Sequence, residues 1–174
     1  VQLPGREGRL SEAPLSDARE LARRLARALR SEGLGALPYE LFGHSMGGLL
    51  AFELARELRR CGQPAAQRLV VSACRAPHLP PGRALHALPD AELAVEIARL
   101  GDARALEHPA LRQLVLPALR ADLAAHERYA FVEEPPLDSP IVACGGEDDL
   151  LVTRRDLVAW REHTSASFEA TLLP

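Results

Sequence analysis

Residues 41–58 read LFGHSMGGLLAFELAREL and place one serine, Ser45, between a short apolar run and a long helical pattern. The pentapeptide at residues 43–47 matches G-x-S-x-G. Where a strand turns sharply into a helix, this spacing holds the serine in a strained conformation with its hydroxyl projecting outward. The flanking positions Gly43 and Gly47 are crowded against each other, so only very small side chains fit there. We therefore predict a strand, a nucleophilic serine and a helix, in that order.

The helix that follows Ser45 also favours negative charge near its start. Helix N-termini carry the positive end of the helix dipole, and the backbone N–H of Met46 points to the position where an oxyanion forms. His44 lies beside the nucleophile but points away from the serine hydroxyl. We expect His44 to pack or to make a local hydrogen bond.

A catalytic serine needs a base that takes its proton and an acid that orients the base, in the chain order Ser, acid, His for this class of turn. Residues 140–152, PIVACGGEDDLLV, offer the acid, because an apolar strand, two glycines and three carboxylates follow one another. The spacing G-x-x-D-x-x-V over residues 146–152 selects Asp149, with Asp148 as the alternative. We therefore predict Asp149 as the orienting acid.

Apolar runs alternate with helical patterns along the whole chain. We predict strands at residues 1–3, 39–43, 67–72, 140–144 and 168–173, and helices at 16–33, 46–60, 88–100 and 108–131, the last broken or kinked at Pro117. Strands that are apolar on both sides and alternate with helices predict an α/β fold, in which helices cover both faces of a mostly parallel sheet.

Residues 75–131 contain two helical patterns and no strand pattern. A single crossover helix between parallel strands needs a shorter segment. We therefore expect this insertion to be a lid within one domain of 174 residues. The alternative is a pair of ordinary covering helices.

The composition restricts the partners and the setting of the protein. The chain has 21 basic and 24 acidic side chains, and its net charge of −3 gives no electrostatic case for binding nucleic acid or an anionic membrane. No apolar run approaches the roughly 20 residues that span a bilayer. Three widely spaced cysteines favour a reduced, cytoplasmic setting. No pair of His, Cys or acidic residues has metal-binding spacing, so we expect neither a metal nor another cofactor.

None of the six histidines is well placed to be the base. His78 follows the third predicted strand near the expected rim of the pocket and is a candidate for substrate contact. His163 follows Asp149 in sequence but lies near the end of the helix that Thr153 opens. A histidine there suits the negative end of the helix dipole, so we interpret His163 as structural. Packed or solvated roles are expected for His86, His108 and His126.

Further motifs extend the pattern over nearly the whole chain. They are VQLPGREGR at residues 1–9, CRAPHLPP at 74–81, HALPDAEL at 86–93, LRADLAAHERY at 119–129 and LVAWREHT at 157–164. Together with GHSMGG and the 140–152 segment, they make the chain resemble the discrete type II thioesterases of polyketide and nonribosomal peptide assembly lines, within the α/β-hydrolases.

The resemblance implies that Ser45 accepts an acyl group from the phosphopantetheine arm of an acyl or peptidyl carrier protein, and that water then releases the acid. It also implies that Asp149 orients the base and that the Met46 N–H is one oxyanion donor. The implied role is the removal of stalled or wrong acyl groups, by an enzyme that we expect to be a monomer. Arginines of the insertion are candidates for contacting an acidic carrier, namely Arg75, Arg83, Arg99 and Arg112.

Two segments of that family are not found in this sequence. One is similar to F-P-x-A-G-G, precedes the VQLPGR segment and carries the second oxyanion N–H. The other, G-G-H, carries the catalytic histidine and is expected just after Pro174. We therefore expect a fragment that is inactive alone and that exposes apolar surface at residues 1–3 and 69–71. The alternatives are a chain-terminating thioesterase domain of a synthase, a carboxylesterase or lipase, and a non-catalytic binding module.

Overall fold

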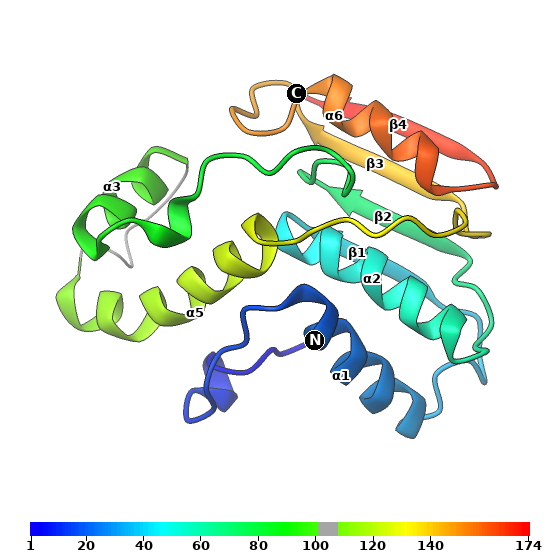
Figure 1. The fold of residues 1–174 in the computed structure, drawn as a ribbon, viewed down its shortest axis with the longest axis horizontal. Helices are drawn as coiled ribbons and strands as arrows, with labels where there is room; N and C mark the ends of the chain where they lie inside the picture. The colour runs from blue at the N-terminus through cyan, green and yellow to red at the C-terminus, as the bar shows by residue number, and fades with distance from the viewer. Residues whose placement is uncertain (101–107) are drawn as a thin grey trace. The chain divides into compact units, whose positions relative to one another are not determined.

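The computed structural model of the chain describes residues 1–100 and 108–174 (Figure 1). They form two compact units. The larger unit consists of residues 18–79 and 130–174, and the smaller one of residues 1–17 and 80–129. The insertion expected at 75–131 thus corresponds to most of a separate unit, which also includes the first residues of the chain.

Four parallel strands form the sheet of the larger unit, in the order β1-β2-β3-β4. They are β1 (Glu40–His44), β2 (Arg68–Ser72), β3 (Ile141–Gly146) and β4 (Phe168–Leu173). Parallel neighbours need crossover connections, which explains why helical segments separate these strands in the sequence. The predicted parallel α/β sheet is confirmed, and the four strands lie within two residues of their predicted positions. The expectation that helices cover both faces is not met within the described residues, because the helices that contact the strands lie on the face that contains Gly43 and Gly145.

Three helices of the larger unit position the strand ends. Helix α1 (Ala18–Ser31) packs on α2 (Met46–Arg60), and α2 packs on β1 and β2. Helix α6 (Arg154–Val158) contacts β3 and β4. The predicted opening at Thr153 is confirmed, because Thr153 and Asp156 form a reciprocal capping box at the start of α6.

The two faces of the sheet differ in exposure. Side chains alternate along a strand, and one set lies buried on the face where Gly43 meets α2 and Gly145 meets α6. Leu69 and Val71 belong to this set and are 0% exposed. The expectation of exposed apolar surface at 69–71 is therefore wrong. Phe42 of β1 points to the opposite face and is 69% exposed.

The smaller unit is helical. It contains two short 3-10 helices, η1 (Glu7–Arg9) and η2 (Leu85–Ala87), and the helices α3 (Asp90–Leu100) and α5 (Pro109–Glu127). Helix α5 continues through Pro117, so the expected break there is wrong. The burial of Leu116 and Ala118 on either side of the proline explains why the helix persists despite one lost N–H hydrogen bond.

Side-chain hydrogen bonds hold the smaller unit together. The Glu127 carboxylate accepts the backbone N–H groups of Leu85 and His86, at 3.0 and 2.9 Å. Arg6 donates two hydrogen bonds of 2.8 Å to Asp122, which ties the start of the chain to α5.

The strand predicted at residues 1–3 is not formed. Pro4 follows at once and has no N–H to continue a ladder, and Leu3, only 8% exposed, packs instead. Val1 is 92% exposed, so the expected exposure of residues 1–3 holds for Val1 and fails for Leu3. No helix within the described residues is long and apolar enough to span a bilayer.

Candidate active site

Ser45 occupies the joint between β1 and α2. Its backbone angles are φ 52° and ψ −124°, a region that residues with side chains rarely adopt, and it is exposed. Two backbone hydrogen bonds hold it there, because the Ser45 N–H donates to the Ser72 carbonyl at 2.8 Å and the Ser45 carbonyl accepts the Gly48 N–H at 2.9 Å. Backbone strain of this kind costs about 1–3 kcal/mol and is concentrated at functional sites.

The crowding predicted around the serine is present on one side only. A Cβ atom on Gly43 would lie 1.9 Å from the backbone oxygen of Gly47. A Cβ atom on Gly47 would meet no atom of the described residues within 4 Å. Gly43 is therefore required by the backbone of the next helix, whereas the expected crowding at the Gly47 side chain is wrong.

This asymmetry predicts opposite results for two matched substitutions. Gly43→Ala should lower the free energy of unfolding by at least about 3 kcal/mol, because a backbone must move to admit the methyl group. Gly47→Ala should be neutral or stabilising by up to about 1 kcal/mol, since alanine favours a helix over glycine. Urea titration of both variants measures the difference, and equal losses would contradict this geometry.

Met46 is the first residue of α2, so its N–H belongs to the helix start, where N–H groups have no intrahelical acceptor. No backbone hydrogen bond outside the helix is formed by this N–H among the described residues. The group is therefore available for an oxyanion that develops beside Ser45.

Asp149 lies in the loop that follows β3, at the same carboxyl edge of the sheet as Ser45. Its Oδ1 accepts the backbone N–H groups of Leu151 and Val152, at 2.8 and 3.0 Å. The loop is further held because the Glu147 N–H donates to the carbonyl of Leu173 at 2.8 Å. Asp149 is half-buried, whereas Asp148 is exposed at the turn, which favours Asp149 as the oriented carboxylate.

The histidines of the larger unit are engaged elsewhere. His44 Nδ1 lies 3.1 Å from Ser72 Oγ, a local hydrogen bond of the kind expected from the sequence. His78 Nδ1 lies 2.7 Å from His163 Nε2, and the His163 ring packs on Phe52 and Trp160. Among the described residues, no hydrogen bond joins the Ser45 hydroxyl to an imidazole.

His163 is structural, as expected, but for a different reason. It ends the 3-10 helix η3 (Ala159–His163) and is only 6% exposed. Burial, with the nearby His78 and Arg56, lowers the pKa of His163 to about 4. The imidazole is therefore neutral at pH 7, so the proposed attraction of a charged ring to the helix dipole is wrong.

This depressed pKa predicts acid sensitivity. Above about pH 6.5, the ordinary histidine value, both folded and unfolded chains carry a neutral His163. Between that pH and 4, the unfolded chain takes a proton that the folded chain refuses, so the free energy of unfolding should fall. Urea titrations at pH 7.5, 6 and 4.5 should show a smaller fall for His163→Gln, which keeps a polar group near His78 but cannot become charged.

His108→Gln serves as the control, because His108 is exposed, and it should follow the wild-type pH dependence. Glu134 contributes mainly at lower pH, from its ordinary pKa of 4.5 downward, since hydrogen bonds from Arg60 and Arg56 outweigh burial and hold its pKa at about 2. Its effect is common to all three proteins and therefore cancels in the comparison. Parallel curves for wild type and His163→Gln would show that His163 does not carry the effect.

Comparison with known proteins assigns this geometry to a family. A family profile described as Thioesterase domain matches residues 1–174. The chain belongs to the thioesterase family. The structure of the RedJ thioesterase from the prodiginine pathway of Streptomyces coelicolor is 45% identical, with a TM-score of 0.95, over 100% of this chain and 69% of RedJ.

Two other relatives support the assignment. The structure of the type II thioesterase BorB from the borrelidin cluster is 40% identical, with a TM-score of 0.85, over 99% of this thioesterase and 68% of BorB. The protein named linear gramicidin dehydrogenase LgrE, from Brevibacillus parabrevis, is 43% identical over 99% of this thioesterase and 67% of LgrE. The thioesterase chain thus spans about two thirds of each of these relatives.

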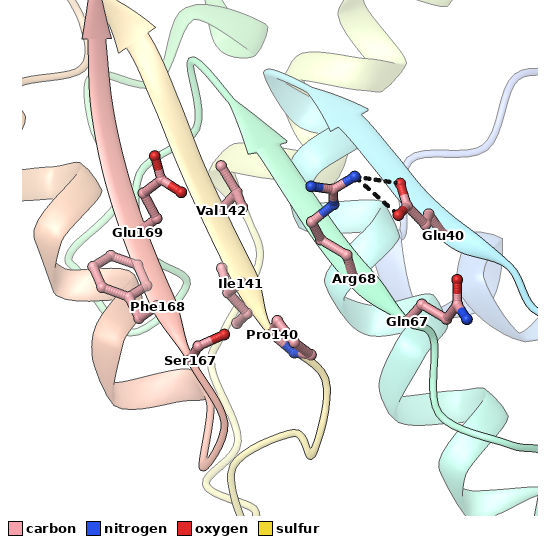
Figure 2. Close-up of a pocket in the computed structure, with 9 residues that line it drawn as sticks. All are labelled: Glu40, Gln67, Arg68, Pro140, Ile141, Val142, Ser167, Phe168 and Glu169. Atoms are coloured by element: carbon pink, nitrogen blue, oxygen red, sulfur yellow. Dashed lines mark hydrogen bonds and ion pairs between the residues drawn. The ribbon is translucent and has the colours of Figure 1, made fainter.

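A pocket of the larger unit lies at the amino ends of the strands (Figure 2). It has a volume of about 530 Å³ and is lined by the first residues of all four strands, among them Glu40, Arg68 and Ile141. Arg68 donates to both carboxylate oxygens of Glu40 there, at 2.9 and 3.0 Å. The amino ends of parallel strands lie at the opposite edge from Ser45, so this pocket is not part of the thioesterase site. No group of three or more His, Cys, Asp or Glu side chains within residues 1–100 and 108–174 is placed to hold a metal ion.

Two residues beside Ser45 were not singled out from the sequence. Ser72 ends β2 and contacts both Ser45 and His44. Ala73 follows with a φ of 46°, again in the left-handed region. The segment LVVSAC carries no turn signal that predicts this strain, so only the structure reveals it.

Proposed function

We propose that the protein containing this chain is an editing thioesterase that hydrolyses acyl groups from the phosphopantetheine arm of carrier proteins. The observation that carries the proposal is the strained, exposed Ser45 at a strand-to-helix joint, with the Asp149 loop at the same sheet edge. The matches to RedJ and to the type II thioesterase BorB support the substrate class.

The residues suggest two steps. The Ser45 Oγ attacks the thioester carbonyl, its proton passes to a base, and the oxyanion develops near the Met46 N–H. The tetrahedral intermediate expels the pantetheine thiol, which receives the proton. Water then attacks the acyl-serine ester in the same way, which releases the carboxylic acid and restores the serine hydroxyl.

The base in this proposal is the family's histidine, which we expect beyond residue 174. Leu173 pairs with Gly146, and its carbonyl accepts the Glu147 N–H at 2.8 Å. A segment that continues from β4 therefore starts beside the loop of Asp149, where an imidazole can be oriented by the carboxylate. As expected from the sequence, we also propose that the protein is a monomer, that it is cytoplasmic and that the insertion at residues 75–131 is a lid.

The deciding experiment offers the whole protein three substrates. These are an acetylated carrier protein, an acetylated pantetheine thioester and a p-nitrophenyl acetate ester. Release of acetate from the carrier, with a higher kcat/KM than for the ester, supports an editing thioesterase. Preference for the ester would favour a carboxylesterase, and inertness toward short acyl groups would favour a chain-terminating domain.

Carrier docking makes a separate prediction for the arginines of the smaller unit. Arg83 and Arg99 have side chains that are 63% and 70% exposed, and both lie near Glu96. Arg83→Glu or Arg99→Glu should raise KM for the acyl-carrier roughly threefold, because a rim charge steers association, and should leave small thioesters unaffected. Steady-state kinetics on both substrates test this.

Two further arginines complete the design. Arg27→Glu, on the exposed face of α1, is the control and should change neither KM. Arg75, an initial candidate, donates to Asp156 at 3.1 Å and is better explained as a support of α6. Equal effects of the Arg83 and Arg99 variants on both substrates would place these residues in the acyl pocket or the fold instead.

A further inference from the structure

The conformation of Ser45 needs a partner that holds it. A residue with positive φ relaxes unless its surroundings over-determine it. On the helix side, Gly43 presses against Gly47 and the Ser45 carbonyl accepts the Gly48 N–H. On the sheet side, the Ser45 N–H donates to the carbonyl of Ser72 at 2.8 Å.

Ser72 contacts the joint between β1 and α2 a second time, through its side chain. Its Oγ lies 3.1 Å from Nδ1 of His44, the residue directly before the nucleophile. His44 and Ser72 are register partners on neighbouring parallel strands. Ser72 of β2 therefore binds both the backbone of Ser45 and the side chain of His44. These are the two residues joined by the peptide bond that leads into the joint.

Ser72 is itself anchored firmly. It pairs with Cys144 of β3, and the N–H of the next residue, Ala73, donates to the Cys144 carbonyl at 2.8 Å. Ala73 has a φ of 46°, so the chain turns sharply here as it does at Ser45, where φ is 52°. Two residues with positive φ thus follow the ends of adjacent strands, and the N–H of each donates to a carbonyl of the next strand, Ser72 for Ser45 and Cys144 for Ala73.

We propose that Ser72 is a positioning residue for the nucleophile. Its hydroxyl fixes His44, and His44 in turn fixes the end of β1, so that the Ser45 hydroxyl and the Met46 N–H keep their mutual orientation. This inference rests on the proposed function of Ser45 as the nucleophile. Small displacements of a reacting group cost much rate, so a single hydrogen bond at this place affects acylation.

The test uses the whole protein and the variants Ser72→Ala and Ser72→Thr. The alanine variant should lower kcat and the rate at which a fluorophosphonate probe labels Ser45 by about three- to tenfold, with KM unchanged. Threonine keeps the hydroxyl and suits a strand, so Ser72→Thr should recover most of the rate. The double variant His44→Ala, Ser72→Ala should be no slower than the slower single variant, because both remove the same contact.

Thr171→Val is the matched control. Thr171 of β4 pairs in register with Cys144, two strands from Ser72 and on the same face of the sheet, and removing its hydroxyl should leave the labelling rate unchanged. The inference is overturned if the probe labels Ser72→Ala at the wild-type rate. It is also overturned if the loss of labelling rate is no larger than the loss of folded protein measured in a thermal melt. A wild-type protein that the probe does not label at Ser45 would overturn the proposed function instead.

Discussion

Replacement of Ser45 by alanine in the whole protein should abolish thioester hydrolysis. Loss of a triad nucleophile typically lowers kcat by about 10⁶, and the remaining site accounts for a small residual rate. Alanine and serine meet the same backbone strain at a φ of 52°, so the fold should be unchanged. The measurement is acid release from an acylated carrier protein, together with the melting temperature of the variant.

Ser31→Ala provides the control, because Ser31 is an exposed serine at the end of α1 whose hydroxyl donates to the Ala28 carbonyl at 2.7 Å. Its kcat should match wild type. If the Ser45→Ala enzyme kept more than about a tenth of the wild-type rate, a loss far smaller than a missing nucleophile causes, Ser45 would not be the nucleophile.

Replacement of Asp149 by asparagine should lower kcat by roughly 10⁴, because the base then loses its correct tautomer. The structure makes this a clean substitution. Oδ1 of Asp149 accepts two backbone N–H groups, and the asparagine oxygen can accept the same pair, so the loop should keep its shape while the negative charge is lost.

Asp148→Asn is the neighbouring control. Asp148 is exposed at the turn after β3, and its substitution should cost much less activity. Steady-state kinetics of the two variants, with melting temperatures to confirm folding, compare them directly. The opposite ranking would move the catalytic acid to Asp148 and shift the G-x-x-D-x-x-V interpretation by one residue.

Local sequence signals were enough to predict the four strands of the sheet and the positions of Ser45 and Asp149 after two of them. Gly43 is required where the strand turns into α2, and Thr153 caps α6 with Asp156. These features depend on residues close together in the chain, where crowding and hydrogen bonding act whatever the rest of the protein does. The same local constraints placed Ser45 and the Asp149 loop after their strands.

The environment of the site was decided by contacts between distant segments. His78 and His163 are 85 residues apart in sequence, and only folding brings His78 Nδ1 to 2.7 Å from His163 Nε2 and makes His163 a buried, neutral group.

The hydrogen bonds that hold Ser45 also depend on contacts between distant segments. The strained φ of Ala73 and the hold of Ser72 on His44 and Ser45 arise from the parallel register of β1, β2 and β3. A strand pattern specifies which residues are extended, but the carbonyl that each strand end meets depends on which strand becomes its neighbour. The thioesterase class could therefore be predicted from a few local motifs, whereas the partners that hold Ser45 could be identified only from the assembled sheet.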